Sequence, residues 1–204
     1  MGDQRNRNLL IIFAKYPEAG EVKTRLAKGV GEEKAAELYS KMVDYTIEVA
    51  SQVGCDVELC YGDERRIGSW DNSVQKSTSQ ENGDLGHRMS QAFNVAFENN
   101  YEKVVLIGSD CMELTTEILK ESFEALDYNE LTIGPSHDGG YYLIGMTKYY
   151  PVLFEDMEWS TEEVLSDTMH RVKWIGVGVE FQETLSDVDN INDLKKVKWL
   201  NDLV

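Results

Sequence analysis

Apolar side chains fill two short stretches of the chain without interruption. Residues 9–14 and 104–107 show no alternation between apolar and polar positions, and β-branched residues recur in both stretches. Strands that are buried on both faces, as in parallel sheets, have this composition, whereas half-exposed strands alternate. The pattern therefore predicts an α/β protein in which residues 104–107 form a central strand of a mostly parallel sheet.

Periodicity and flanking residues predict the other elements. The further strand-like runs lie at 56–61, 130–133, 141–145 and 177–182, with a short candidate strand at 74–77. The predicted helices occupy 32–52, a segment that opens at 83–89, 115–126, a segment that begins at a capping box at 160–163, and a final segment after 189. The 204 residues suit one α/β domain and are few for two.

Asp110 comes just after the predicted central strand. The apolar run ends at Gly108, so Asp110 lies past the carboxyl end of the strand, where open α/β sheets bind their ligands. A carboxylate at that place can hold a metal ion. The alternative is that Asp110 caps the helix that begins near Thr115 or Thr116, although the intervening residues weaken that interpretation.

The loop after the first strand concentrates positive charge in an acidic chain. The chain has 20 basic and 37 acidic residues, and its net charge of −17 argues against nucleic acid or an anionic membrane as a partner. The loop at 15–25 nevertheless carries Lys15, Lys23 and Arg25, and Gly20 lets a ligand approach the backbone closely. We expect a site for nucleotide phosphates there; the alternative is a solvated loop with unrelated cations.

Glycines and carboxylates recur in later loops. Gly86 and Arg88 lie at a predicted helix start, whose free N–H groups suit a phosphate or a base. Asp138 precedes two glycines between strand-like runs, which form either a simple turn or the border of a substrate site. Asp187 and Asp189 precede the last helix and either cap it or serve a metal ion, one as ligand and the other as a brace.

Composition also bears on location and on cysteine chemistry. The chain has no apolar run of 18 residues, and its first residues are polar, which predicts a soluble cytoplasmic protein without a membrane partner. The 3 cysteines lack the number and spacing of a disulfide framework or a zinc site. Cys111 is expected to be an ordinary small buried residue.

Several of these stretches together resemble a known family. The stretches are Phe13-Ala-Lys-Tyr-Pro-Glu-Ala-Gly-Glu-Val-Lys-Thr-Arg-Leu26, Gly83-Asp-Leu-Gly-His-Arg-Met89, Gly108-Ser-Asp-Cys111, Gly134-Pro-Ser-His-Asp-Gly-Gly-Tyr-Tyr-Leu-Ile-Gly145 and Asp187-Val-Asp189. They span most of the chain and look like the glycosyltransferase-A-like bacterial proteins related to 2-phospholactate guanylyltransferase and molybdenum-cofactor guanylyltransferase. The resemblance implies a three-layer α/β/α nucleotide-diphospho-sugar transferase fold of Rossmann-like type, with the nucleotide over its amino-terminal half.

The resemblance also implies roles for single residues. The implied nucleotide-binding residues are Ala14, Lys15, Gly20, Lys23, Arg25, Gly86 and Arg88. Lys23, Arg25 and Asp110 would be catalytic. The implied metal, Mg²⁺ or Mn²⁺, would bind Asp110 and Asp189, which matches the second acid of the relatives better than Asp187 does. The acceptor would face Asp138, Gly139 and Gly140. Tyr16-Pro-Glu-Ala replaces glycines that the relatives often carry, and Met112 replaces a common proline.

The leading hypothesis is a metal-dependent transferase that acts on a nucleotide and a small-molecule acceptor. Transfer of a nucleotidyl group from a nucleoside triphosphate to a phosphorylated acceptor is favoured, because a triphosphate brings more negative charge to the basic loop. A glycosyltransferase that uses a nucleotide sugar and a non-catalytic nucleotide-binding module are the alternatives. Trp159 is either a core aromatic residue or part of the acceptor pocket. The base, the acceptor and the oligomeric state are not predicted.

Overall fold

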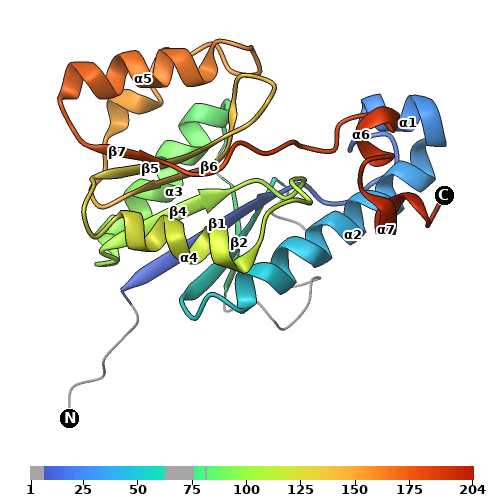
Figure 1. The fold of residues 1–204 in the computed structure, drawn as a ribbon, viewed down its shortest axis with the longest axis horizontal. Coiled ribbons are helices and arrows are strands. Elements are labelled where there is room, and N and C mark those ends of the chain that lie inside the picture. Colours follow the sequence, from blue (N-terminus) through green and yellow to red (C-terminus); the bar gives the residue numbers. More distant parts are fainter. Residues whose placement is uncertain (1–6, 63–75, 81) are drawn as a thin grey trace.

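The described strands form one seven-stranded sheet in the order β3-β2-β1-β4-β6-β5-β7. The computed structural model describes residues 7–62, 76–80 and 82–204 (Figure 1). The strands are β1 (Asn8–Ala14), β2 (Asp56–Tyr61), β3 (Lys76–Ser79), β4 (Lys103–Ile107), β5 (Leu131–Pro135), β6 (Tyr141–Met146) and β7 (Val179–Phe181). Among them only β6 is antiparallel to its neighbours, β4 and β5. The mostly parallel sheet and the central position of β4 are confirmed.

Helices cover both faces of this sheet. They are α1 (Thr24–Val30), α2 (Glu32–Ser51), α3 (Leu85–Glu98), α4 (Thr116–Ala125), α5 (Val164–Ile175), α6 (Ile191–Leu194) and α7 (Lys198–Asn201), with a short 3-10 turn η2 (Pro151–Leu153). Figure 1 shows α2 and α4 on one side of the sheet and α3 and α5 on the other, which confirms the three-layer prediction. No helix within the described residues is long and apolar enough to cross a lipid bilayer.

The alternation of β1 explains why both faces are buried. Leu10 and Ile12 belong to the core beneath α2 and α4, whereas Leu9 and Ile11 belong to the core beneath α3 and α5. All four side chains are almost fully buried. Because a strand sends successive side chains to opposite faces, a strand covered on both sides must be apolar throughout. Each buried side chain of this size contributes about 1.5–3 kcal/mol to folding.

Two predicted helix starts are confirmed by their capping contacts. The Thr115 side chain accepts a hydrogen bond from the Ile118 backbone at 3.3 Å and caps α4, so Asp110 does not cap that helix. Asp84 caps α3 by accepting from the His87 backbone at 2.8 Å. The predicted strand at 74–77 overlaps β3, and residues 74 and 75 lie outside the described residues.

Three local predictions about helices were wrong. The capping box at 160–163 does not form, because α5 begins only at Val164 without a side-chain cap, and the Leu165 backbone donates instead to Gly139 O at 2.9 Å. Residues 24–30 form α1 rather than continuing the loop. The final helix is two short helices, and its cap is Asn190, which forms a capping box with Asp193. Neither Asp187 nor Asp189 therefore serves as that cap.

Candidate functional site

Lys23 lies between two carboxylates at the carboxyl ends of the central strands. Its ammonium donates to Asp110 Oδ2 at 2.6 Å and to Asp189 Oδ1 at 3.0 Å. Arg25 reaches the other oxygen of Asp189, at 3.2 Å. The Lys23 side chain is only 7% exposed, whereas that of Arg25 is 73% exposed. Burial, the largest single influence, lowers the pKa of Lys23, but the charges and hydrogen bonds of the two acids together raise it.

The backbone holds Lys23 in an unusual conformation. Its φ of 46° and ψ of 45° lie in the left-handed region at the N-terminus of α1. Non-glycine residues seldom adopt this region, and such residues persist where the surrounding structure fixes them. The buried Val22 and Leu26 anchor the chain on either side. The residues around Lys23 therefore fix its backbone, and the side chain extends from there to the two acids.

The segment before α6 carries Asp189 to the end of β4. Leu185 pairs with the end of β5, donating to Pro135 O at 3.1 Å and accepting from the His137 backbone at 3.1 Å. The Val188 backbone then donates to Asp110 O at 3.0 Å. These contacts fix the two acids next to each other, although 78 residues separate them in the sequence.

Asp187 is the third acid at this edge of the sheet. Its Oδ1 is buried and has no hydrogen-bond partner among the described residues. Burial, with a smaller contribution from the charge of Asp110, raises the pKa of Asp187 to about 8, and Lys23 opposes the shift. A buried carboxyl group without a donor prefers its neutral form. The surroundings of Asp187 therefore favour its protonated form.

The chemistry of these donors fits a hard divalent cation. Within the described residues, no group of three or more histidine, cysteine or acidic side chains has the spacing of a metal site. Mg²⁺, however, commonly binds one or two carboxylates and takes its other oxygens from phosphates and water. Asp110 and Asp189 converge on one cationic point, which Lys23 fills. Two carboxylates of this kind fit a metal that is completed by a phosphate ligand.

The smaller of two adjoining cavities, of about 470 Å³, lies over the carboxyl ends of β1 and β4. Its cationic lining residues are Lys15, Lys23, Arg25 and Arg88. The Lys15 backbone donates to the Tyr39 hydroxyl at 2.9 Å, and this hydroxyl lies 2.9 Å from Ser109 Oγ. The buried Tyr39 thereby joins the start of the basic loop to the segment that carries Asp110.

Gln80 also lines this smaller cavity and orients Arg88. The Gln80 amide donates to Ala14 O at 3.2 Å and to Cys60 O at 2.9 Å, and its own oxygen accepts from Arg88 Nη1 at 2.8 Å. Because the backbone ends of β1 and β2 fix the amide, they also fix the guanidinium. Sequence reasoning missed Gln80, since nothing local distinguishes one polar residue after a short strand.

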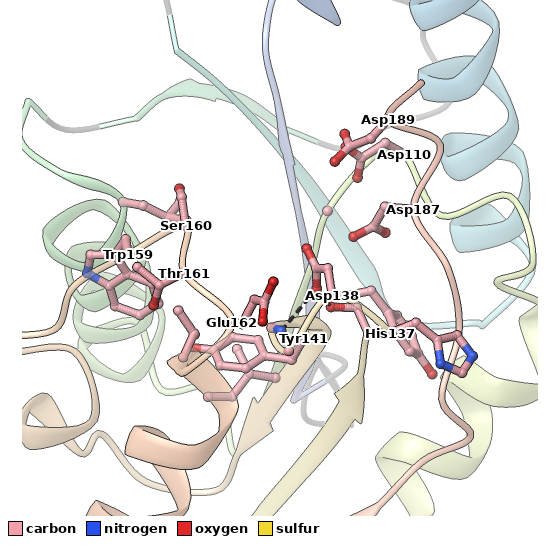
Figure 2. Close-up of a pocket in the computed structure, with 18 of the residues that line it drawn as sticks. Asp110, His137, Asp138, Tyr141, Trp159, Ser160, Thr161, Glu162, Asp187 and Asp189 are labelled. Carbon is pink, nitrogen blue, oxygen red and sulfur yellow. Dashed lines mark hydrogen bonds between the residues drawn. The ribbon is translucent and has the colours of Figure 1, made fainter. Parts of the chain in front are cut away.

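The larger cavity, of about 840 Å³, extends from the same acids along the carboxyl end of β5 and the amino end of the antiparallel strand β6. Figure 2 shows Asp110 and Asp189 close together at one end, Trp159 at the other, and Asp138 and Glu162 between them. The acidic lining residues are Asp110, Asp138, Glu162, Asp187 and Asp189, and the basic ones among the described lining residues are Arg25 and His137. The larger cavity is thus strongly acidic with an aromatic end.

Asp138 is held by its own loop. The Ser136 hydroxyl and the Gly140 backbone, the latter at 3.0 Å, donate to Asp138 Oδ1. The other carboxylate oxygen has no hydrogen-bond partner in the described part of the chain and belongs to the cavity wall. Gly139 has a φ of 89°, and a Cβ there would overlap the Glu162 backbone. This glycine lets the loops 136–140 and 159–163 pack together.

Comparison with protein families decides the relationship. The family described as "Uncharacterized protein conserved in bacteria (DUF2064)" matches residues 45–161. The chain belongs to DUF2064. A comparison with curated proteins found no match. The related guanylyltransferases named in the sequence analysis stay a prediction.

Solved structures share the fold of this DUF2064 chain. A protein of Desulfovibrio desulfuricans G20, provisionally called a nucleotide-diphospho-sugar transferase, has 33% identity and a TM-score of 0.89 over 94% of this chain and 86% of its own. The inositol-1-phosphate CTP transferase of T. maritima has 16% identity and a TM-score of 0.62, over 96% and 94%. Rv0371C of Mycobacterium tuberculosis H37Rv, in complex with manganese, has 14% identity and a TM-score of 0.57, over 95% and 98%. These similarities confirm the nucleotide-diphospho-sugar transferase fold.

The structure brings most of the predicted site residues of the DUF2064 chain to one edge of the sheet. Those that line the smaller cavity are Ala14, Lys15, Lys23, Arg25, Arg88, Asp110 and Asp189. Those that line the larger cavity are Arg25, Asp110, Asp138, Gly139, Gly140 and Asp189. Their roles in binding or catalysis stay predictions. Cys111 is buried in the core, and burial raises the pKa of its thiol.

Two predicted residues line neither cavity. Gly20 has a φ of 85°, which shapes the loop. Gly86 is buried in α3, and a Cβ there would overlap the Trp159 indole nitrogen and lie 2.7 Å from Phe154 O. Gly86 thus allows Trp159 to pack against α3, where it forms the wall of the larger cavity. The predicted contact of Gly86 with a nucleotide gains no support from this position.

Proposed function

We propose that this chain is a metal-dependent transferase that binds a nucleotide donor in the smaller cavity and an acceptor in the larger one. The observation that carries the proposal is the bridge of Lys23 between Asp110 and Asp189, at the place where the two cavities meet. Basic side chains in the smaller cavity can bind phosphate oxygens, and the acids at the junction can hold a metal ion beside them, so the site suits a reaction at a phosphate. The provisional transferase from Desulfovibrio desulfuricans G20 supports the same class.

The nucleotide phosphates suit the smaller cavity because its lining contains four basic residues, against the acids Glu21, Asp110 and Asp189. Lys15, Arg25 and Arg88 supply ammonium and guanidinium donors, and the latter two can bind phosphate oxygens in pairs. A divalent cation, when bound, would neutralise phosphate charge and polarise a phosphoryl oxygen. Asp110 and Asp189 would hold it, as two carboxylates typically hold Mg²⁺ beside phosphates. The manganese complex of Rv0371C supports a divalent ion in this fold.

The acceptor suits the larger cavity, whose charge limits what the acceptor can be. Asp138 and Glu162 line it, and the basic residues in its described lining are Arg25 and His137. A phosphorylated acceptor would bring more negative charge to these carboxylates. The charge distribution therefore disfavours the phosphorylated acceptor that the sequence analysis favoured, and supports an uncharged acceptor with hydroxyl groups.

Nucleotidyl transfer is the first candidate reaction. An acceptor oxygen forms a bond to the α-phosphorus, the bond to the bridging oxygen breaks, and pyrophosphate leaves while the acceptor proton passes to solvent or a carboxylate. The lysine and arginine side chains would neutralise charge on the leaving phosphates, and the fixed loops would supply positioning. Glycosyl transfer from a nucleotide sugar is the second candidate, because the larger cavity is lined both by the aromatic ring of Trp159 and by the carboxylates of Asp138 and Glu162, which suit a sugar ring and its hydroxyl groups.

A binding panel followed by a product assay tests the proposal. Nucleoside triphosphates and nucleotide sugars, each with Mg²⁺ or Mn²⁺, should raise the melting temperature, because a ligand at 100 times its Kd adds about 2.7 kcal/mol of stability. Arg25→Met should weaken this effect, whereas Lys41→Met, which breaks a surface ion pair with Asp44 on α2, should not. No shift with any nucleotide and either metal would overturn the proposal.

The product assay separates the candidate reactions. Release of pyrophosphate with polyhydroxyl acceptors indicates nucleotidyl transfer, and release of a nucleoside diphosphate indicates glycosyl transfer. Sugar phosphates, assayed in parallel, should be poorer acceptors than the matching free sugars. Tight nucleotide binding without turnover over a wide acceptor panel would favour the non-catalytic binding module instead.

A further inference from the structure

The Lys23 ammonium makes the same contacts that a bound cation would make. One point lies within 2.6 Å of Asp110 Oδ2 and 3.0 Å of Asp189 Oδ1, and the side chain that occupies it is 7% exposed. Surface lysines seldom give up so much hydration, since their ammonium is strongly hydrated. Two acids from distant parts of the chain converge on this nitrogen. The site is therefore neutralised by a side chain of the protein itself.

A lysine and a divalent cation cannot share this point. Both need the same two carboxylates, and like charges a few ångströms apart repel each other by several kcal/mol in a partly buried site, about 4 kcal/mol for unit charges at 4 Å. Arg25 does not resolve the conflict, because of the two acids it pairs with Asp189 and not with Asp110, and its side chain is 73% exposed. Either the metal stays out, or Lys23 leaves.

The Lys23 ammonium can move from the two carboxylates into the smaller cavity. Lys23 lines that cavity together with Lys15 and Arg88, where the proposed nucleotide phosphates would lie. Its four-carbon stem has rotatable bonds throughout, so the ammonium can move without a change in the backbone. The left-handed conformation of Lys23, with a φ of 46°, keeps the start of this stem fixed between the carboxylates and the cavity.

We infer that Lys23 is a built-in placeholder: its ammonium holds the metal position between Asp110 and Asp189 in the free protein and transfers to the donor phosphates when the metal binds. This inference rests on the proposed function, since that function supplies the metal and the phosphates. It predicts that the free protein binds the metal weakly. Phosphate ligands that attract Lys23 then strengthen metal binding, and the coupling is reciprocal.

The test is a titration with Mn²⁺ alone, without nucleotide, followed by electron paramagnetic resonance of the free ion. Lys23→Met should bind Mn²⁺ at least about tenfold more tightly than the wild type, a change within the usual range of coupling between sites. Mn²⁺ should also raise the melting temperature of Lys23→Met more than that of the wild type, because it restores the charge balance of the two acids. Asp189→Asn added to Lys23→Met should abolish the gain.

Lys15→Met is the matched control. Lys15 lines the same cavity and carries the same charge, but makes no ion pair among the described residues. Its removal should change Mn²⁺ affinity less than about threefold, because only general electrostatics is altered. If Lys23→Met does not fold, Lys23→Gln keeps an N–H donor group without the positive charge and should show the same direction of change.

Equal Mn²⁺ affinity in the wild type and the Lys23 variants, or an equal gain in Lys15→Met, would overturn the inference. The titration needs neither acceptor nor turnover, so a failed transferase assay would leave its result standing. Conversely, a chain that transfers groups normally while Lys23→Met gains no Mn²⁺ affinity would refute the placeholder alone and leave the proposed function intact.

Discussion

The two cavities meet along seven shared lining residues and differ in the charged side chains that each adds to them. The shared residues are Phe13, Arg25, Leu85, Gly108, Asp110, Ser160 and Asp189. The smaller carries four basic residues, from the segment 15–25 and from α3, beside Glu21 and the two shared acids. Tyr39 and Gln80 hold its walls through backbone contacts. The larger is acidic and aromatic, and loops that pack through Gly139 form its walls. A chain with a net charge of −17 thus separates its few cations from its many acids within one site.

This difference gives direction to the proposed reaction. An anionic donor is attracted to the smaller cavity and disfavoured in the larger, and an uncharged acceptor has no such preference. The acids at the junction would hold the metal, so the two ligands would meet there. Substitutions at the junction should therefore impair the use of both the donor and the acceptor. Substitutions that affect the wall of one cavity should impair only the ligand of that cavity.

Asp110→Asn tests the junction and should have the largest effect. The change removes one proposed metal ligand and leaves Lys23 with Asp189 as its remaining carboxylate partner among the described residues. Turnover should fall by about 10³-fold, as when a group that stabilises developing charge is removed. Asp44→Asn, which changes a surface ion pair on α2, should leave turnover unchanged. Full activity of Asp110→Asn with a real substrate would refute the assignment.

Gly139→Ala tests the wall of the larger cavity. The new methyl group would overlap the Glu162 backbone, at a residue whose φ of 89° already disfavours side chains. Urea unfolding should show a loss of about 1–3 kcal/mol, which is typical of overpacking. Acceptor-dependent turnover should fall while nucleotide affinity is kept. Gly54→Ala is the matched control, because its φ is 84° and its Cβ would meet nothing within 4 Å; an equal loss there would mean that strain alone is responsible.

Arg88→Met and Asp138→Asn form a crossed pair. Arg88→Met should weaken nucleotide binding about tenfold and leave the acceptor KM unchanged, since a hydrogen bond to a charged group contributes about 1.5–3 kcal/mol. Asp138→Asn should raise the acceptor KM by a similar factor without changing nucleotide affinity, measured by calorimetry. If either variant affects both ligands equally, the division between the cavities is wrong.

Asp187→Asn should have the smallest effect, on stability rather than turnover. The pKa of Asp187 in the folded protein is about 8, above its ordinary value of 3.8. Between these values the folded protein keeps a proton that the unfolded chain has released, so stability falls as the pH rises from 4 to 8. At pH 8.5 the variant should melt about 2–4 °C higher, equivalent to about 1 kcal/mol for a protein of this size. Melting curves from pH 4 to 9 should also be flatter, and an unchanged slope would contradict the assignment.

Local patterns were reliable guides wherever neighbouring residues alone decide the structure. The uninterrupted apolar runs of β1 and β4 required burial on both faces, and Thr115 and Asp84 are good caps whatever surrounds them. The capping box at 160–163 failed because Gly139 and Glu162 pack against each other, a contact between residues far apart in sequence. The sequence could not show that Gly86 packs against Trp159, because this partly buried residue is 73 positions away.

By itself the sequence determined the alternation of strands and helices, the basic loop after β1 and the acid after β4, because hydrophobic period and strand-end position are local properties. Tertiary structure alone decided which distant groups meet. The insertion of β6 between β4 and β5, and the pairing of residue 185 beside β5, bring Asp189 and Asp138 to the edge that already holds Asp110. Lys23 then lies between Asp110 and Asp189 because the fold brings these three distant segments together. Charges that are scattered along the sequence thereby form one site in which opposite charges pair.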